Sequence, residues 1–240
     1  MSNRVFYGTG ASPAIPYALA ILSAAREPGP DVTHLLLPVP TKDPSQYRNV
    51  LSRLPEDITI IGGNLSETAF PGKKILDLLH DPQYLAQNAA ITAHCALKLA
   101  MNHLPCTLDH IPVLVIGWGR IGKCLSRLLQ SLGAQVAIYA RKESDRAMAQ
   151  ALGLYEEDSN WDHISQYRLI FNTVPAPVLP RHACQLCRED AVLIELASRP
   201  GIEWDSVIDG RGLPGKEAPE SSGKLIAETV LRLTRQEDVR

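Results

Sequence analysis

The stretch VLVIGWGRIG, residues 113–122, decides which fold we expect for this chain. Its four leading apolar residues predict a buried strand, and three glycines follow at close intervals. Glycine is unfavourable inside a strand or helix, so the backbone here requires a conformation or a close approach that a side chain would block. The spacing Gly-x-Gly-x-x-Gly between a strand and a helix is typical of a turn that binds the pyrophosphate of a dinucleotide. The residues of this predicted cofactor-binding turn are Gly117, Trp118, Gly119, Arg120, Ile121 and Gly122.

The residues after the turn complete a strand–helix–strand unit and bear on the choice of cofactor. Leucines at helical spacing predict a helix that ends near Gly133, and the strand that follows ends at Arg141 and Lys142. An NAD site usually has Asp or Glu at this strand end, where the carboxylate binds the ribose 2′-hydroxyl. An arginine instead suits a 2′-phosphate, because a guanidinium can bind phosphate through two parallel hydrogen bonds. We therefore predict NADP, with NAD as the alternative. Two other interpretations stay open: the domain could be a Rossmann-like scaffold that has lost its cofactor, and Arg141 and Lys142 could be solvated surface charges.

Two later strands should bring polar residues to the same edge of the sheet. In a doubly wound sheet, ligands bind at the carboxyl ends of the strands. The loop after RLIFN is therefore predicted to border the cofactor, and an arginine in the loop after AVLIELA could pair with a substrate carboxylate or simply lie on the surface. The residues concerned are Asn172, Thr173, Val174 and Pro175 in the first loop, and Ser198 and Arg199 in the second.

Strand and helix patterns along the chain predict an α/β protein of two domains joined by long helices. Alternating strands and helices up to about residue 80 suggest a small flavodoxin-like domain, and a doubly wound Rossmann domain follows it. Asp81 is expected to cap a long helix over residues 82–104, and this helix and a terminal helix over 221–235 are expected to cross between the domains. The predicted segments are 1–85 for a reduced N-terminal domain, 86–107 for the connecting helix, 108–215 for the Rossmann domain and 216–240 for the C-terminal helix.

Composition excludes several classes of protein. The 240 residues have a formal net charge of -2 without long runs of one sign, which argues against nucleic acid as a partner. No apolar run approaches the length of a membrane-spanning helix. Five scattered cysteines and no visible signal peptide favour the cytoplasm. Cys184 and Cys187 form a lone C-x-x-C pair, which we interpret as two thiols on a helix face, so no metal site is expected.

Beyond the glycine turn, several stretches resemble the dipicolinate synthase A family. They are NAAITAHCALKLAMNH, GWGRIGKCLSRLLQSLGAQV, FNTVPAPVL, ELASRPG and GLPGKEAPESSGKLIAE, and the likeness covers about residues 73–230. The resemblance implies a fold shared with D-2-hydroxyacid dehydrogenases and S-adenosylhomocysteine hydrolases, with a second domain that faces the cofactor cleft. It also implies a nicotinamide-linked oxidoreductase that, together with a second, flavoprotein-like subunit, forms pyridine-2,6-dicarboxylate in sporulating bacteria.

The resemblance also assigns roles to individual residues. The glycine turn, Arg141, Thr173 and Pro175 would hold the cofactor, and the loop over residues 212–215 would close over the cleft. The residues that would line the substrate side are Asn88, Thr92, Ser198 and Arg199. A homodimer is expected, for which apolar residues of the last helix could provide contacts or instead belong to the core.

Three departures from the family pattern bear on the substrate. The N-terminal domain is expected to lack one βα unit, and Ile202 replaces the second glycine of the family's SRPGG. Where the family has T-x-E-G, this chain has Thr92-Ala93-His94-Cys95. His94 could act as a general acid/base, bind a carboxylate as a cation, or merely lie on a helix face. The alternatives are a D-2-hydroxyacid dehydrogenase-like enzyme, for which we find no convincing Glu–His pair, and a non-catalytic nucleotide-binding or scaffold protein.

Overall fold

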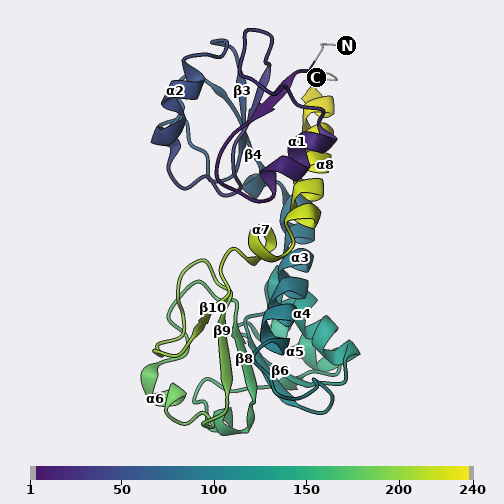
Figure 1. Cartoon of the computed structure of the whole chain (residues 1–240). Coiled ribbons are helices and arrows are strands. Elements are labelled where there is room, and N and C mark those ends of the chain that lie inside the picture. The colour runs from purple at the N-terminus through teal and green to yellow at the C-terminus, as the bar shows by residue number, and fades with distance from the viewer. Residues whose placement is uncertain (1–3, 238–240) are drawn as a thin grey trace. The chain divides into compact units, whose positions relative to one another are not determined.

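A computed structural model describes residues 4–237 of the chain (Figure 1). The chain divides into two compact units. Unit 1 holds the described residues up to Asn88 and those from Pro214 onward, and unit 2 holds Ala89–Leu213. Each unit is built on a parallel sheet, so the predicted α/β class is confirmed.

Unit 1 contains a four-stranded sheet in the order β1-β2-β3-β4. A flavodoxin-like sheet has the order 2-1-3-4-5, and removing its outer strand 2 leaves a sequential order like this one. A sequential sheet has no position where the strand order reverses. The strands are β1 (Phe6–Gly8), β2 (His34–Leu36), β3 (Thr59–Gly62) and β4 (Lys74–Asp77). The helices of this unit are α1 (Ile15–Ile21), η1 (Pro44–Tyr47), α2 (Arg48–Leu51), η2 (Leu78–His80) and α8 (Pro219–Glu237).

Helices α1 and α8 pack side by side in unit 1 (Figure 1). Gly223 makes the close crossing possible, because a Cβ there would lie 2.5 Å from Tyr17 Cβ and 2.6 Å from the Ala14 carbonyl oxygen. The terminal helix, which we expected to cross between domains, is therefore part of unit 1 through its contact with α1. The buried core on the sheet includes Leu35 and Ile60.

Unit 2 contains a six-stranded parallel sheet in the order β10-β9-β8-β5-β6-β7. Numbered from the first strand of the unit, this order is 6-5-4-1-2-3, which is the Rossmann order. The strand order reverses between β5 and β8, and a crevice for ligands is expected at such a reversal. The strands are β5 (Pro112–Ile116), β6 (Gln135–Tyr139), β7 (Tyr155–Glu156), β8 (Leu169–Asn172), β9 (Val192–Glu195) and β10 (Ile208–Asp209).

The helical elements of unit 2 are unequal in length. Helix α4 packs on β5 and β6, with Leu125 and Leu129 fully buried. The connection from β7 to β8 contains a single short helical turn, and Trp161 and Tyr167 from this connection fill the core beside Leu114. The helical elements that lie wholly in unit 2 are α4 (Arg120–Ser131), α5 (Glu143–Ala151), η3 (Ile164–Gln166) and α6 (Arg181–Cys184). Helix α3 (Pro82–Met101) is divided between the units, and α7 (Leu213–Glu217) begins at the last residue of unit 2.

Several local expectations can be compared with these elements. The predicted cap of α3 is confirmed, because Asp81 Oδ1 accepts a hydrogen bond from the Tyr84 N–H at 2.7 Å. The expected loop over residues 212–215 is wrong: after Gly212 the chain enters α7, whose second residue is a proline with a helix-compatible backbone. Helix α6 ends at Cys184, so Cys187, which we expected on the same helix face, lies beyond the helix.

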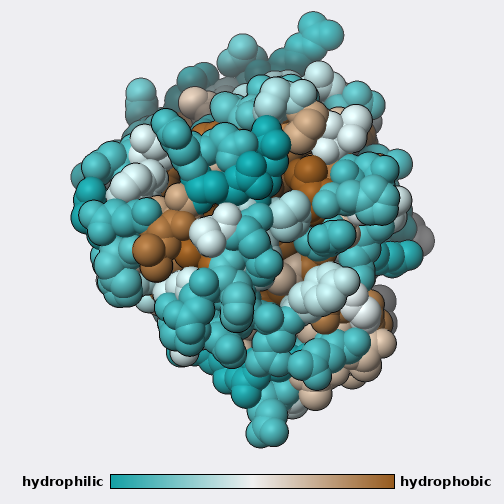
Figure 2. All heavy atoms as spheres, turned by 90° about the horizontal axis from the view of Figure 1, so that it is seen from below, coloured by the Kyte–Doolittle hydropathy of each residue, from teal (hydrophilic) through white to brown (hydrophobic). Residues whose placement is uncertain are grey.

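Within residues 4–237 no helix combines the length and the apolar character that a membrane span requires. Figure 2 shows a mainly hydrophilic face on which apolar residues occur in small, separate patches.

Candidate functional site

The three glycines of the turn after β5 have different surroundings. Gly117 has a φ of +104°, in the region that favours glycine, and a Cβ there would collide with Thr173 Oγ1. A Cβ on Gly122 would collide with the carbonyl oxygen of Gly117, so the third glycine allows α4 to pack against the turn. A Cβ on Gly119 would meet nothing within 4 Å. The second glycine therefore keeps open a space in front of the turn, while the other two allow close packing of the protein itself.

Helix α4 begins at this open space. Gly119 is its N-cap residue, and no side chain caps the helix there. The first amides of a helix have no acceptor within the helix, and together with the helix dipole they favour an anion. The amides of Arg120 and Ile121 are thus suited to the pyrophosphate of a dinucleotide. Trp118 is almost buried, so its indole is turned into the protein rather than into this space.

The loop after β8 lies against the glycine turn. The Thr173 N–H and the Thr173 hydroxyl each donate to the Ile116 carbonyl oxygen at 2.9 Å, and Val174 Cγ2 lies 2.8 Å from where a Cβ on Gly117 would be. Pro175 follows and is exposed. The structure thus brings the predicted segment from Thr173 to Pro175 next to the turn. Its role toward a cofactor stays a prediction.

Asn172, the last residue of β8, is fully buried and bonded within the protein. Its Oδ1 accepts from the Val174 N–H at 2.9 Å, and its Nδ2 donates to the Val174 carbonyl and to both carboxylate oxygens of Glu195 at 2.9 and 3.1 Å. Because no polar atom of this side chain reaches solvent, Asn172 holds the loop after β8 and does not present its amide to a ligand.

Glu195 ends β9 and organises the neighbouring loop. Its oxygens accept from the backbone N–H groups of Ala197 at 2.9 Å, Gly201 at 2.7 Å and Ile202 at 3.3 Å, in addition to the Asn172 amide. Glu195 is 4% exposed, so this carboxylate is a buried acceptor that connects the two loops at the edge of the sheet. Sequence reasoning missed it. The available signal was a carboxylate that directly follows the apolar residues of a buried strand.

The loop after β6 presents Arg141 and Lys142 to solvent. Neither makes an ion pair within the described part of the chain. Arg146, which the sequence analysis did not single out, fixes the backbone beneath them: its Nη1 donates to the carbonyl oxygens of Ala140 at 3.2 Å and Arg141 at 2.9 Å. Its Nε also pairs with Glu156 at 2.7 Å. The cationic loop end therefore has a fixed backbone and side chains that are able to extend toward an anion.

The residues predicted for the substrate side lie on two elements. Thr92 and His94 belong to the part of α3 in unit 2; Thr92 is buried and His94 is exposed. Ser198 and Arg199 are exposed in the loop that Glu195 organises. Asn88 belongs to unit 1. Their roles toward a substrate stay predictions.

The C-x-x-C pair has the properties of structural thiols. Burial, with smaller effects from Cys187 and Glu203, raises the pKa of Cys184 to about 12, and burial raises the pKa of Cys187 to about 11. A thiol becomes a metal ligand or nucleophile as its thiolate, and a raised pKa makes the thiolate rare at neutral pH. Within residues 4–237 no group of three or more His, Cys, Asp or Glu side chains could hold a metal ion.

Comparisons with known proteins agree with this geometry. Residues 96–208 match the family described as "D-isomer specific 2-hydroxyacid dehydrogenase, NAD binding domain". Unit 2 contains a Rossmann-like NAD-binding domain. The dipicolinate synthase A protein of Bacillus subtilis (strain 168) is 27% identical over 171 residues, which cover 67% of this chain and 58% of that protein. The match therefore spans less than two thirds of that relative's length.

Solved structures extend the likeness in fold. The crystal structure of dipicolinate synthase A from Bacillus halodurans has a TM-score of 0.81 at 20% identity, covering 95% of this chain and 96% of that one. The crystal structure of its counterpart from Bacillus subtilis has a TM-score of 0.78 at 20% identity, covering 98% and 96%. The resemblance to dipicolinate synthase A found in the sequence is thus confirmed.

Proposed function

We propose that this protein is an NADP-linked oxidoreductase of the dipicolinate synthase A type. The observation that carries the proposal is the open approach at Gly119, where the N-terminus of α4 meets the reversal of strand order between β5 and β8. A dinucleotide site needs backbone amides that a pyrophosphate can reach, and this turn offers them without a Cβ in the way. The match to an NAD-binding domain over residues 96–208 supports a nicotinamide dinucleotide site in this part of the chain.

In this proposal, residues at the sheet edge contact successive parts of the NADP molecule. The amides of Arg120 and Ile121 bind the pyrophosphate, and Arg141 with Lys142 binds the 2′-phosphate beyond the end of β6. The loop from Thr173 to Pro175 borders the nicotinamide. The cofactor supplies hydride chemistry when bound. The protein contributes the orientation of the ring and the exclusion of water from it.

The proposed substrate is a cyclic dicarboxylate of the dihydrodipicolinate type. Oxidation of such a ring to the aromatic pyridine releases one hydride, for which oxidised NADP would be the acceptor, and one proton. Arg199 pairs with a substrate carboxylate, and its exposed guanidinium makes no ion pair among the described residues. His94, which stands where the family has a carboxylate, receives the proton. The family likeness also supports a flavoprotein-like partner and a sporulating source. We further propose a homodimer and a location in the cytoplasm, which the scattered cysteines favour.

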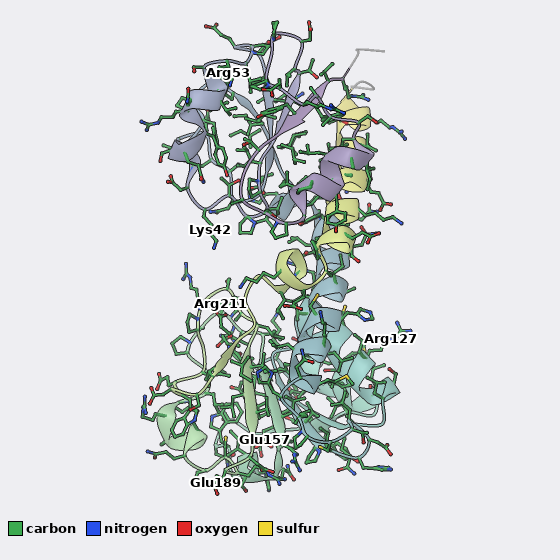
Figure 3. All side chains as sticks on the ribbon, in the orientation of Figure 1. Lys42, Arg53, Arg127, Glu157, Glu189 and Arg211 are labelled. Atoms are coloured by element: carbon green, nitrogen blue, oxygen red, sulfur yellow. The ribbon has the colours of Figure 1, made fainter. Side chains whose placement is uncertain are left out.

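The cofactor assignment is tested by titrating NADPH and NADH and following the nicotinamide fluorescence. We expect NADPH to bind at least tenfold more tightly than NADH, and Arg141→Ala to remove most of that preference while leaving NADH affinity unchanged. Arg53→Ala, an exposed arginine of unit 1 labelled in Figure 3, is the matched control and should change neither affinity. Equal affinity of the native protein for the two nucleotides would contradict the role of Arg141.

The same preparation separates the proposal from its alternatives. Turnover of a cyclic dicarboxylate that Arg199→Ala abolishes supports the proposed reaction. Nucleotide binding without turnover, even after addition of a flavoprotein partner, identifies a nucleotide-binding or scaffold protein instead. Turnover of a 2-hydroxy acid identifies a dehydrogenase of the kind named by the family match.

A further inference from the structure

A cavity of about 460 Å³ lies at α4 and α5 in unit 2, lined by side chains to which the proposed dinucleotide site assigns no role. Its volume is in the range of small-molecule sites. One wall is polar and comes from the glycine turn and α4. The other wall is apolar and comes from α5 and the residues that follow it. The two walls differ in chemistry, and each restricts what the cavity can bind.

The polar wall contains two buried groups without a hydrogen-bond partner. Trp118 Nε1 and Ser126 Oγ are both buried, and neither has a partner within the described part of the chain. Trp118 is 8% exposed and Ser126 is fully buried. Buried polar groups are nearly always paired in native proteins, because an unpaired one loses its hydrogen bonds to water without replacement. Both residues belong to the lining of the cavity, but their two polar atoms are covered, so the polar character of its surface comes from the cationic side chains described next.

Two cationic side chains line the same wall of the cavity. Lys123 and Arg127 lie one helical turn apart on α4, and both are exposed. Lys123 Nζ lies 5.9 Å from the centre of the Trp118 ring, and Figure 3 shows Arg127 extending away from the ribbon. Neither makes an ion pair within residues 4–237, and no acidic residue lines the cavity. Like charges four residues apart on a helix repel each other, so an anion between them is favoured.

The apolar wall favours a ligand with an apolar part over an inorganic anion. It consists of Met148 on α5, Leu152 directly after the helix, and Leu154. Met148 and Leu152 are 56% and 58% exposed, so both present apolar surface to the cavity and to solvent. An inorganic anion would leave this surface in water. A ligand with an apolar body and one acidic head would cover the apolar wall and satisfy the polar one together.

We propose that the cavity at α4 and α5 binds a small amphipathic monocarboxylate, with the carboxylate at Lys123 and Arg127 and the apolar body against Met148 and Leu152. The proposal does not depend on the proposed oxidoreductase activity, because it rests on residues outside the pyrophosphate and 2′-phosphate contacts.

The test is calorimetric titration of the full chain with decanoate below its micellar concentration, with decanol as the uncharged control ligand. We expect saturable binding of one decanoate per chain and at least tenfold weaker binding of decanol. The double variant Lys123→Ala/Arg127→Ala should weaken decanoate binding at least tenfold. Lys42→Ala/Arg53→Ala, which removes two exposed cations of unit 1 labelled in Figure 3, should leave it unchanged.

Several results would overturn the proposal. Absence of saturable binding, equal binding of decanol, or full affinity in the Lys123/Arg127 double variant would each remove the carboxylate site. Sedimentation is the second measurement. If the native chain is a dimer and Met148→Glu makes it a monomer, the apolar wall is covered by a second copy of the chain and not by a carboxylate. Titration of NADPH in the same variants, expected to be unaltered by Lys123→Ala/Arg127→Ala, separates failure of this site from failure of the dinucleotide site.

Discussion

The two parallel sheets begin alike and differ in what their first turn leaves open. Strand β1 is followed by Thr9 and Gly10, and β5 is followed by Gly117, Trp118 and Gly119. A Cβ on Gly10 would lie 2.5 Å from Pro38 Cγ, so the first turn of unit 1 is filled by protein. A Cβ on Gly119 would meet nothing within 4 Å. The turn after β1 is therefore packed against other residues of unit 1, whereas the turn after β5 faces open space.

The difference follows from the order of the strands. In unit 1 the order is sequential, and the helix after the turn has 7 residues. In unit 2 the order reverses between β5 and β8, and the helix after the turn has 12 residues. A reversal separates the loops on the two sides of the first strand and leaves a crevice between them. Glycines in a turn indicate a ligand site only when the sheet topology provides such a crevice.

The edges of the two sheets also depend on different carboxylates. In unit 1 Asp77, at the end of β4, accepts from the N–H groups of Leu65 and Leu79, each at 2.8 Å. In unit 2 Glu195, at the end of β9, accepts from three backbone N–H groups and from the Asn172 amide. Loss of the edge carboxylate should therefore lower the free energy of unfolding more in unit 2 than in unit 1.

The largest effect is expected for Glu195→Ala, which leaves several buried donors without an acceptor. Each such donor costs about 1–3 kcal/mol, so the free energy of unfolding should fall by about 3 kcal/mol or more. Glu195→Gln, which keeps one acceptor oxygen, should lose less. Urea unfolding followed by circular dichroism measures both. Glu189→Ala, at an exposed carboxylate labelled in Figure 3, is the control and should change the free energy by no more than about 0.5 kcal/mol.

Alanine substitutions at Gly10 in unit 1 and Gly119 in unit 2 compare the two turns directly. Gly119→Ala should leave the free energy of unfolding within about 0.5 kcal/mol but raise the NADPH dissociation constant at least tenfold, about 1.4 kcal/mol, because the methyl group enters the open space. Gly10→Ala should do the reverse. With a φ of +121° and a collision with Pro38, it should cost about 1–3 kcal/mol of stability and leave NADPH affinity unchanged.

The pair of glycine variants has a clear contrary result. If Gly119→Ala binds NADPH as tightly as the native chain, the space in front of the turn is not where the pyrophosphate binds. If Gly10→Ala weakens NADPH binding as much as Gly119→Ala does, the two turns do not differ in function.

The sequence predicted the features that depend on neighbours along the chain. The glycine turn and the Asp81 cap are local patterns, and both could be interpreted from a few adjacent residues. The link between Asn172 and Glu195 joins residues 23 positions apart, and neither residue type indicates such a pairing. The loop expected over residues 212–215 failed for a related reason, because Gly212 and Pro214 are equally compatible with the start of a helix.

The burial of Trp118 shows the same limit. Its place between two glycines predicted a cofactor contact, but the structure turns the indole toward α4, where Lys123 lies over the ring. Which way a side chain points from a turn depends on the packing of the helix behind it. Backbone contributions to the site could therefore be predicted, whereas side-chain contributions required the fold.

The smallest effect is expected at an ion pair of unit 1, which is partly open to solvent. Asp81 Oδ1 accepts from Arg232 Nη2 at 2.6 Å and also from the Tyr84 N–H. Burial alone would raise the pKa of Asp81, but these hydrogen bonds and the charge of Arg232 outweigh it and hold the pKa below its usual value. Arg232→Met should lower the free energy of unfolding by about 1 kcal/mol at pH 7.

The lowered pKa fixes how this loss depends on pH. A carboxyl whose pKa is lower in the folded state stabilises the fold above its unfolded pKa, about 3.9, and this stabilisation is lost as pH falls through the folded pKa. The difference between the native chain and Arg232→Met, measured by urea unfolding, should therefore shrink between pH 7 and pH 3. Lys224→Met, which removes an exposed pair with Glu228 on the same helix at 3.9 Å, is the matched control and should show almost no difference at either pH. A loss at Arg232 that is equally large at pH 3 would mean that the arginine stabilises α8 through the packing of its alkyl chain and not through Asp81.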